Sequence, residues 1–404
     1  MKIPINPYFL LILPFTLTSF LFDVGLSISI SDIAIISLLC ISIYKYPSIK
    51  ISFIGISFIA LAVYILNAGI YLEYTQREFY LNSHFTNFLR VILIAAILLI
   101  IPNPKIIKLG RIITGLRLVI LFHCYFMFFD VVSPNIFDWD GDYITLNTDL
   151  DDTLIGRPRG LFIEPAFFAI FMGISLTLVL QYEKNHSNLI FNLRDFLIIV
   201  FALILSSSVS ALFIAILFIF YYLFLRKGSR EGFISALRSS FLLLTLSIML
   251  LIGGAGTILA YSASRISNVV SLEDSSGTTR LLGSTLFSIK VASEKPFTGI
   301  GLGGANLGLA LDEDFVSRQL IGGNVSNVSY STATHWAGLI TTSGLIGLII
   351  YYLFILGNLV YHPATRVLAT GVFVVGIGGG QIFSLFLWMS IAVGILLQNK
   401  YEKN

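Results

Sequence analysis

Charged residues are scarce in this sequence. Asp, Glu, Lys and Arg make up only 12% of its 404 residues, whereas a soluble domain carries about 25%. No long polar block interrupts the chain, so we expect a single polytopic membrane domain over residues 1–404 and no separate soluble domain. Cysteine is nearly absent, and Cys40 and Cys124 both lie in apolar runs, which argues against a disulfide framework.

Apolar runs recur along the whole chain. Hydrophobic residues make up 56% of the sequence, and the mean hydropathy is +0.89. A helix that crosses the hydrocarbon core needs about 20 apolar residues. We therefore predict an all-α integral membrane protein, with transmembrane helices at approximately 7–22, 26–44, 51–71, 87–102, 113–133, 160–181, 196–206, 207–225, 240–261, 335–360, 367–379 and 381–397.

The long run at 196–225 decides the number of helices. As one helix it would extend ~45 Å, well beyond a ~30 Å hydrocarbon core. Ser206, Ser207 and Ser208 offer a break between two shorter helices. Two helices also place most of the basic residues, including the loop 226–238, on the side of the N-terminus. The positive-inside rule therefore favours about twelve spans with both termini in the cytoplasm.

This topology leaves two long segments on the outer side, 134–159 and 262–334. The first is rich in Asp. The second carries four aliphatic residues on one helical face, which predicts a short helix at the membrane surface: Leu281, Leu282, Leu286 and Ile289. The glycine-rich run 299–308 lacks the strand and helix of a dinucleotide site, so we interpret it as a tight turn.

Ionisable residues gather at the predicted outer ends of the spans, where such residues are costly and tend to be functional. They are Asp32, Arg90, Arg157, Arg159, Glu164, Arg280 and His335. Arginine presents a planar fork of donors that binds phosphate oxygens, and a carboxylate or imidazole can accept a proton from an attacking hydroxyl. The set therefore suits transfer from a diphosphate. No spacing typical of metal ligands is present, and we expect no metal and no cofactor.

Each of these residues also has a structural interpretation, and residue types alone leave both open. The structural roles are interfacial anchoring for Arg157 and Arg159, a salt bridge for Glu164, helix pairing for Arg90 and Asp32, and interface packing for His335 with Trp336.

Three stretches resemble one family. "RPRGLFIEPAFFA", from Arg157, resembles the Arg-x-x-Gly-Leu-Phe-x-Glu-Pro segment of bacterial O-antigen and exopolysaccharide polymerases. "GTTRLLGSTLFSIKVASEKPFTGIGLGG", from Gly277, is similar to a later pattern of the O-antigen ligase/polymerase superfamily. "THWAGLITTSGLIGLIIY", from Thr334, resembles the family's helix that opens with His. Thr278 and Thr279 depart from the Gly-Arg pair that the family often has, so the turn there differs.

The resemblance implies a GT-C-like glycosyltransferase in the bacterial inner membrane, with its active site on the periplasmic side. A hydroxyl of one lipid-linked repeat would attack the anomeric carbon of the growing chain, and undecaprenyl diphosphate would leave. The implied partners are undecaprenyl-diphosphate-linked oligosaccharides, membrane lipids and a chain-length regulator. No nucleotide sugar is required, and no nucleic acid is expected.

The resemblance also implies roles for single residues. Arg159 and Arg280 would bind the diphosphate, supported by Arg157 and Arg90. Glu164 or His335 would serve as the base. We place His335 first, because it titrates near neutrality at a helix end that solvent reaches. Glu164 would orient Arg159 or the acceptor.

Three other functions compete with this interpretation. An O-antigen ligase, which transfers the finished chain to lipid A-core, shares the donor, and the Glu-Pro segment favours the polymerase over it. A transporter or lipid flippase would favour charges near the midplane and two related halves, neither of which is visible. A membrane scaffold would leave Arg159, Glu164 and Arg280 without a role.

Overall fold

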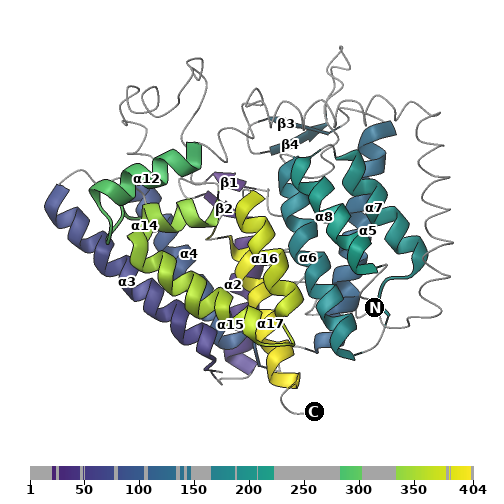
Figure 1. Ribbon diagram of the computed structural model, residues 1–404, viewed down its shortest axis with the longest axis horizontal. Helices are drawn as coiled ribbons and strands as arrows, with labels where there is room; N and C mark the ends of the chain where they lie inside the picture. Colours follow the sequence, from purple (N-terminus) through teal and green to yellow (C-terminus); the bar gives the residue numbers. More distant parts are fainter. Residues whose placement is uncertain are drawn as a thin grey trace. The chain divides into compact units, whose positions relative to one another are not determined.

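The computed structural model describes only part of the chain: residues 21–23, 27–45, 49, 51–76, 81–103, 108–132, 137–140, 143–146, 165–186, 189–206, 208–222, 283–302, 334–378, 382 and 384–401. Regular structure in these residues is helical apart from two short hairpins (Figure 1). The predicted helical class is thereby confirmed. Each predicted span within the described residues overlaps a helix, apart from the span 7–22, of which only Leu21 and Phe22 are described and both belong to strand β1. The span 240–261 and the loop 226–238 lie outside the described residues.

The chain divides into two compact units. The first comprises Met1–Leu38, Ile107–Ser267 and Lys400–Asn404, and the second comprises Leu39–Ile106 and Asn268–Asn399. Helix α2 (Ile30–Lys45) continues from one into the other. Each unit contains a helix long and apolar enough to cross a membrane, so the division does not separate a soluble part from a membrane part.

Four helices of the first unit pack in a closed ring. They are α5 (Leu109–Val132), α6 (Pro165–His186), α7 (Leu193–Leu205) and α8 (Val209–Phe220). Helices α6 and α7 both contact α5 and both contact α8, which closes the ring. All four sequences are strongly apolar, and such helices are stable only where protein or lipid covers them.

The run at 196–225 forms two helices, as predicted. Helix α7 ends at Leu205 with Ser206 as its C-cap, and α8 starts after Ser208. The backbone of Ser208 is extended, with φ −93° and ψ 131°, so the chain leaves the helical conformation there. The two helices then pack against each other.

Two antiparallel hairpins also belong to the first unit. They are β1 (Leu21–Asp23) with β2 (Ser27–Ser29), and β3 (Phe137–Asp140) with β4 (Tyr143–Leu146). The second hairpin lies in the segment 134–159, where no strand was predicted. Its signal is present in the sequence, because aromatic residues alternate with aspartates up to a Gly-Asp pair between the strands.

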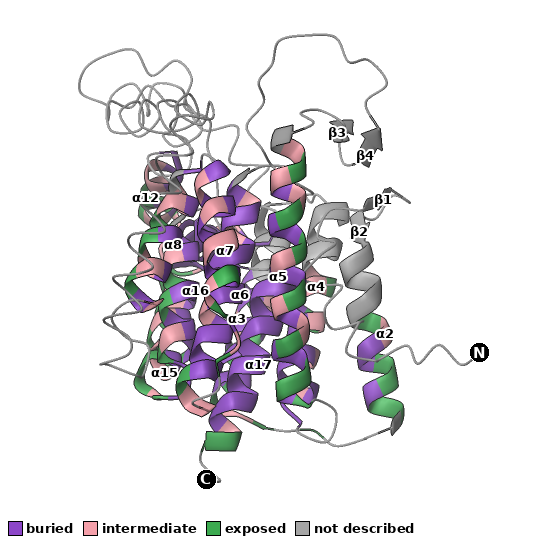
Figure 2. Cartoon of the chain, turned by 90° about the vertical axis from the view of Figure 1, so that its right-hand side faces the viewer, coloured by how far each residue is buried: buried purple, intermediate pink, exposed green. Residues whose placement is uncertain are grey.

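The second unit is built around one interrupted helical stretch. Its elements are α3 (Phe53–Gln76), α4 (Leu81–Ile100), α12 (Ser284–Glu294), α14 (His335–Ile349), the π-helix η4 (Ile350–Leu356), α15 (Gly357–Tyr361), α16 (Arg366–Gly378) and α17 (Leu385–Tyr401). Helix α14 contacts α3, α12 and α16, and η4 also contacts α3. Helix α17 is buried on every side from Leu385 to Gln398 (Figure 2).

The outward faces of several helices are apolar. Among the described residues, three stretches are long and apolar enough to cross a membrane: Leu109–Asp130, Ala166–His186 and His335–Tyr361. On α5, one stripe at helical spacing is exposed (Figure 2): Leu118, Phe122, Tyr125 and Phe129. A helix on a water-facing surface carries polar residues at such positions. Length, composition and this inverted pattern indicate a membrane protein.

Helix α12 confirms the short helix predicted in the segment 262–334. Phe287 and Val291 are buried against Ile340 of α14, whereas Ile289 is 54% exposed. The prediction assigned the leucine-rich face to the membrane surface. The structure packs the neighbouring face on another helix, a tertiary contact that helical periodicity alone does not specify. Ile289 of the predicted face stays exposed, whereas Leu281 and Leu282 lie outside the described residues.

Candidate functional site at His335

Of the predicted site residues, only Arg90 and His335 belong to the described part of the chain. Four lie outside it, so the structure does not test the predicted assembly: Arg157, Arg159, Glu164 and Arg280. Arg90 lies on α4 and is half-buried. His335 is the first residue of α14, after Thr334, whose hydroxyl caps the helix by accepting from the Ala337 amide at 3.4 Å.

The His335 side chain is buried. It is 1% exposed, so the expectation that solvent reaches it is wrong. Its Nδ1 lies 3.1 Å from the Tyr351 hydroxyl, and the two rings meet edge to face at 5.8 Å. A Cβ at Gly376 of α16 would lie 2.6 Å from Nδ1, so a glycine is required for α16 to approach this closely. Nε2 is buried and has no hydrogen-bond partner among the described residues.

An aromatic cluster supports the partner of His335. Tyr351 is 1% exposed and meets the Trp388 ring of α17 edge on at 6.2 Å. Trp388 in turn packs on Phe58 of α3 at 4.4 Å and donates its indole N–H to the Ile382 carbonyl at 2.6 Å. Edge-to-face packing of buried rings fixes their orientation. The Tyr351 hydroxyl is thus held on the Nδ1 side of the imidazole.

A kink in α14 makes this pairing possible. In a straight helix, residues as far apart as His335 and Tyr351 would be ~24 Å apart along the axis. Gly344 interrupts the helix with φ 63° and ψ −163°, and the two halves turn back toward each other. A non-glycine residue rarely adopts this conformation. The kink therefore converts a large sequence separation into direct contact.

Residues 296–300, which follow α12 and which we call the docked segment, are hydrogen-bonded into the kink. The Leu345 amide donates to the Pro296 carbonyl at 2.7 Å, and the Ile300 amide donates to the Thr341 carbonyl at 2.6 Å. These two bonds replace the helical bond between Leu345 and Thr341, so both groups of that bond stay paired. The Tyr64 hydroxyl of α3 also donates to a carbonyl of this segment, that of Phe297.

The docked segment fits because of one further glycine. Gly299 has φ 62°, and a Cβ there would lie 2.5 Å from the Thr341 carbonyl oxygen. Gly301 also has a positive φ, of 80°. The tight turn predicted for the glycine-rich run is confirmed in its described part.

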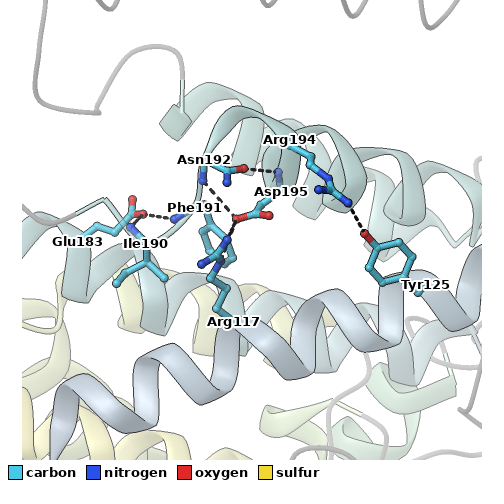
Figure 3. A network of polar contacts seen from close by, with 8 residues as sticks. All are labelled: Arg117, Tyr125, Glu183, Ile190, Phe191, Asn192, Arg194 and Asp195. Carbon is cyan, nitrogen blue, oxygen red and sulfur yellow. Dashed lines mark hydrogen bonds and ion pairs between the residues drawn. The ribbon is translucent and has the colours of Figure 1, made fainter.

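The first unit contains a different polar cluster, at the turn from α6 to α7 (Figure 3). Glu183 accepts hydrogen bonds from the amides of Ile190 and Phe191 at 2.6 and 2.8 Å. Asp195 accepts from Arg117 of α5 at 2.6 and 2.8 Å. Asn192 and Asp195 form a reciprocal capping box at the start of α7. The carboxylates thus close a turn and tie α7 to α5.

The two clusters differ in whether their polar atoms are already hydrogen-bonded. The carboxylates of the turn are engaged by backbone amides and an arginine, as in a structural network. His335 has one nitrogen engaged and one without a described partner, so it can accept or donate a proton. Among the described residues, no group of three or more His, Cys, Asp or Glu is placed to hold a metal ion.

No protein-family model matches the chain, and no curated protein matches its sequence. Tyr351, Gly344 and the docked segment were not predicted as parts of one site. The two glycines in "TTSGLIG" were a signal for a break in a helix. Nothing local marked Tyr351, because its role depends on the angle of the kink.

Proposed function

We propose that the protein is an O-antigen polymerase, a glycosyltransferase that joins undecaprenyl-diphosphate-linked oligosaccharide repeats and releases undecaprenyl diphosphate. The observation that carries the proposal is the segment "RPRGLFIEPAFFA" directly before and within an apolar helix of spanning length, α6. Further support comes from a buried histidine at the start of α14.

In this proposal the arginines hold the donor. Arg159 and Arg280 bind the diphosphate, with Arg157 and Arg90 nearby, because a guanidinium stabilises the charge that develops on the leaving group. His335 takes the proton of the acceptor hydroxyl. Glu164 orients Arg159 or the acceptor.

The proposed topology has about twelve spans in a GT-C-like arrangement. Both termini are cytoplasmic, and the site opens to the periplasmic side of the bacterial inner membrane. The separate helices α7 and α8 support this count, because a single helix there would reverse the orientation of every later segment. The proposed partners are the lipid-linked oligosaccharides, membrane lipids and a chain-length regulator.

Deletion of the gene, followed by gel analysis of lipopolysaccharide, tests the proposal. Core carrying a single repeat is the expected result. Bare core would identify a ligase instead, and a normal ladder would remove both functions. Complementation with Arg159→Lys or Arg280→Lys should fail to restore long chains at normal protein levels, because lysine keeps the charge but loses the fork. Arg366→Lys is the matched control, since Arg366, at the start of α16, donates to the nearby carbonyls of Val360 and Tyr361.

A further inference from the structure

The pairing of His335 with Tyr351 leaves one imidazole nitrogen available. A neutral imidazole carries one N–H, so one nitrogen donates and the other accepts. Tyr351 Oη lies 3.1 Å from Nδ1, while Nε2 is buried without a described partner. We propose that Tyr351 is a positioning residue for His335: its hydroxyl accepts the Nδ1 proton and so presents Nε2 as the acceptor of the substrate's proton. This inference rests on the proposed polymerase function.

The proton at Nδ1 decides whether His335 can be a base. With Nδ1 protonated, the Nε2 lone pair is free to take a proton. With Tyr351 donating to Nδ1 instead, Nε2 carries the hydrogen and can act only as a donor. A base that is oriented by a second group through its far nitrogen is a recurring arrangement in acyl-transfer enzymes. Tyr351 supplies a neutral form of that second group.

The docked segment fixes the geometry of this pair. Its two backbone hydrogen bonds and Gly344 set the angle of the kink, and the angle sets the distance between His335 and Tyr351. Gly376 lets α16 close over the imidazole, and the Trp388 ring holds Tyr351 from the other side. Neither partner in the pair is therefore free to rotate away at low cost.

Burial also favours transfer to a sugar over hydrolysis. At 1% exposure the imidazole has essentially no contact with bulk water. Only a hydroxyl that the site itself brings to Nε2 can give up its proton there. In the step, the acceptor O–H bond breaks and its proton passes to Nε2. The acceptor oxygen bonds to the anomeric carbon as the bond from that carbon to the diphosphate oxygen breaks. Undecaprenyl diphosphate leaves with the electron pair, and the imidazolium returns its proton to that leaving group.

Kinetics on purified full-length protein with a synthetic lipid-linked repeat test the role. A positioned base contributes roughly 10²–10⁴-fold, so His335→Ala should lose that factor and Tyr351→Phe about 10- to 100-fold of it in kcat. KM should change by less than about twofold, because Tyr351 acts through His335 and touches no substrate. Tyr221→Phe is the matched control: it deletes another buried tyrosine hydroxyl, which donates to the Leu180 carbonyl at 3.0 Å. Wild-type kcat in Tyr351→Phe, or an equal loss in Tyr221→Phe, would overturn the proposal.

A second measurement does not depend on activity. Nitrogen-15 spectra of histidine-labelled protein, with His335→Ala to assign the signal, report which nitrogen carries hydrogen. We expect an unprotonated Nε2 in the wild type and a mixture of tautomers in Tyr351→Phe. A protonated Nε2 in the wild type would overturn the positioning role even if polymerisation is confirmed. Wild-type protein that forms no glycosidic bond would instead refute the proposed function and leave the tautomer result to stand alone.

Discussion

The turn between α6 and α7 and the His335–Tyr351 pair are both buried polar clusters, yet they are built on opposite principles. At the turn, the carboxylates of Glu183 and Asp195 meet backbone amides and Arg117. At the pair, a kinked helix holds one imidazole nitrogen and leaves the other without a described partner.

The difference separates structural from functional burial. Burial of an unsatisfied polar group costs about 1–3 kcal/mol, so each such group needs an explanation. For Nε2 of His335, the explanation that we propose is a substrate hydroxyl. In the network at the turn, hydrogen bonds to the carboxylates offset the cost of burying them and hold the turn closed. Variants of the turn should therefore change stability and spare the chemistry, whereas variants of the pair should do the reverse.

The largest expected effect is the difference in thiol labelling between the two clusters' surroundings, because the proposed topology puts them on opposite sides of the membrane. The proposed topology places the α6–α7 turn in the cytoplasm and α12 outside. Cysteines at Leu189, which is 65% exposed, and at Ser293, which is also exposed, test it in a background that lacks Cys40 and Cys124. An impermeant thiol reagent on intact cells should label Ser293→Cys alone. Labelling of Leu189→Cys before permeabilisation would contradict the topology.

The second contrast concerns the kink. Gly344→Ala places a Cβ against the carbonyl of Phe297 in a conformation that alanine rarely adopts. We expect a loss of at least about 3 kcal/mol in unfolding free energy, through strain and loss of the docked segment. Gly357→Ala is the control, because Gly357 is the first residue of α15, has a helical φ of −56°, and a Cβ there would lie 3.3 Å from the Tyr352 carbonyl oxygen, a tight contact without the overlap found at Gly344. It should change stability by less than about 1 kcal/mol. Denaturant titration in detergent measures both, and equal stability would show that the kink does not need glycine.

A smaller loss is expected at the ion pair of the turn. Asp195→Ala removes the partner of Arg117 and half of the capping box. Breaking a buried pair costs about 3–5 kcal/mol, but the Arg117 side chain is 31% exposed, so we expect about 1–3 kcal/mol. Asp195→Asn keeps the cap and should lose less. Turnover per folded molecule should stay at the wild-type value in both, and a large fall in kcat at full stability would give this turn a catalytic role.

Much of this architecture could be predicted from the sequence. Apolar runs located the helices, and the serines at 206–208 located the break between α7 and α8, because both signals are local. The buried face of α12 and the Tyr351 contact could not be predicted. Both depend on the angle at Gly344 and on hydrogen bonds between segments far apart in the chain. His335 was identified as a functional candidate, but its burial arises from α16 and η4 and not from its own neighbours in sequence.

The smallest expected effect is at Glu183. Glu183→Gln keeps an oxygen for the amides of Ile190 and Phe191 but loses the negative charge that strengthens both bonds. We expect a loss of about 0.5–1.5 kcal/mol. The same titration measures it, with kcat as the second readout. A loss as large as that of Asp195→Ala would mean that the charge, and not the geometry, holds the turn.

The central claim is most directly tested by supplying purified protein with one synthetic undecaprenyl-diphosphate-linked repeat and no other sugar donor. Mass spectrometry of the products gives chain lengths, and the released lipid can be counted in the same sample. The account predicts a ladder of lipid-linked chains with one undecaprenyl diphosphate released for each new glycosidic bond, and near loss of both in His335→Ala. Free repeats without new bonds, or no turnover by the wild-type protein, would contradict it.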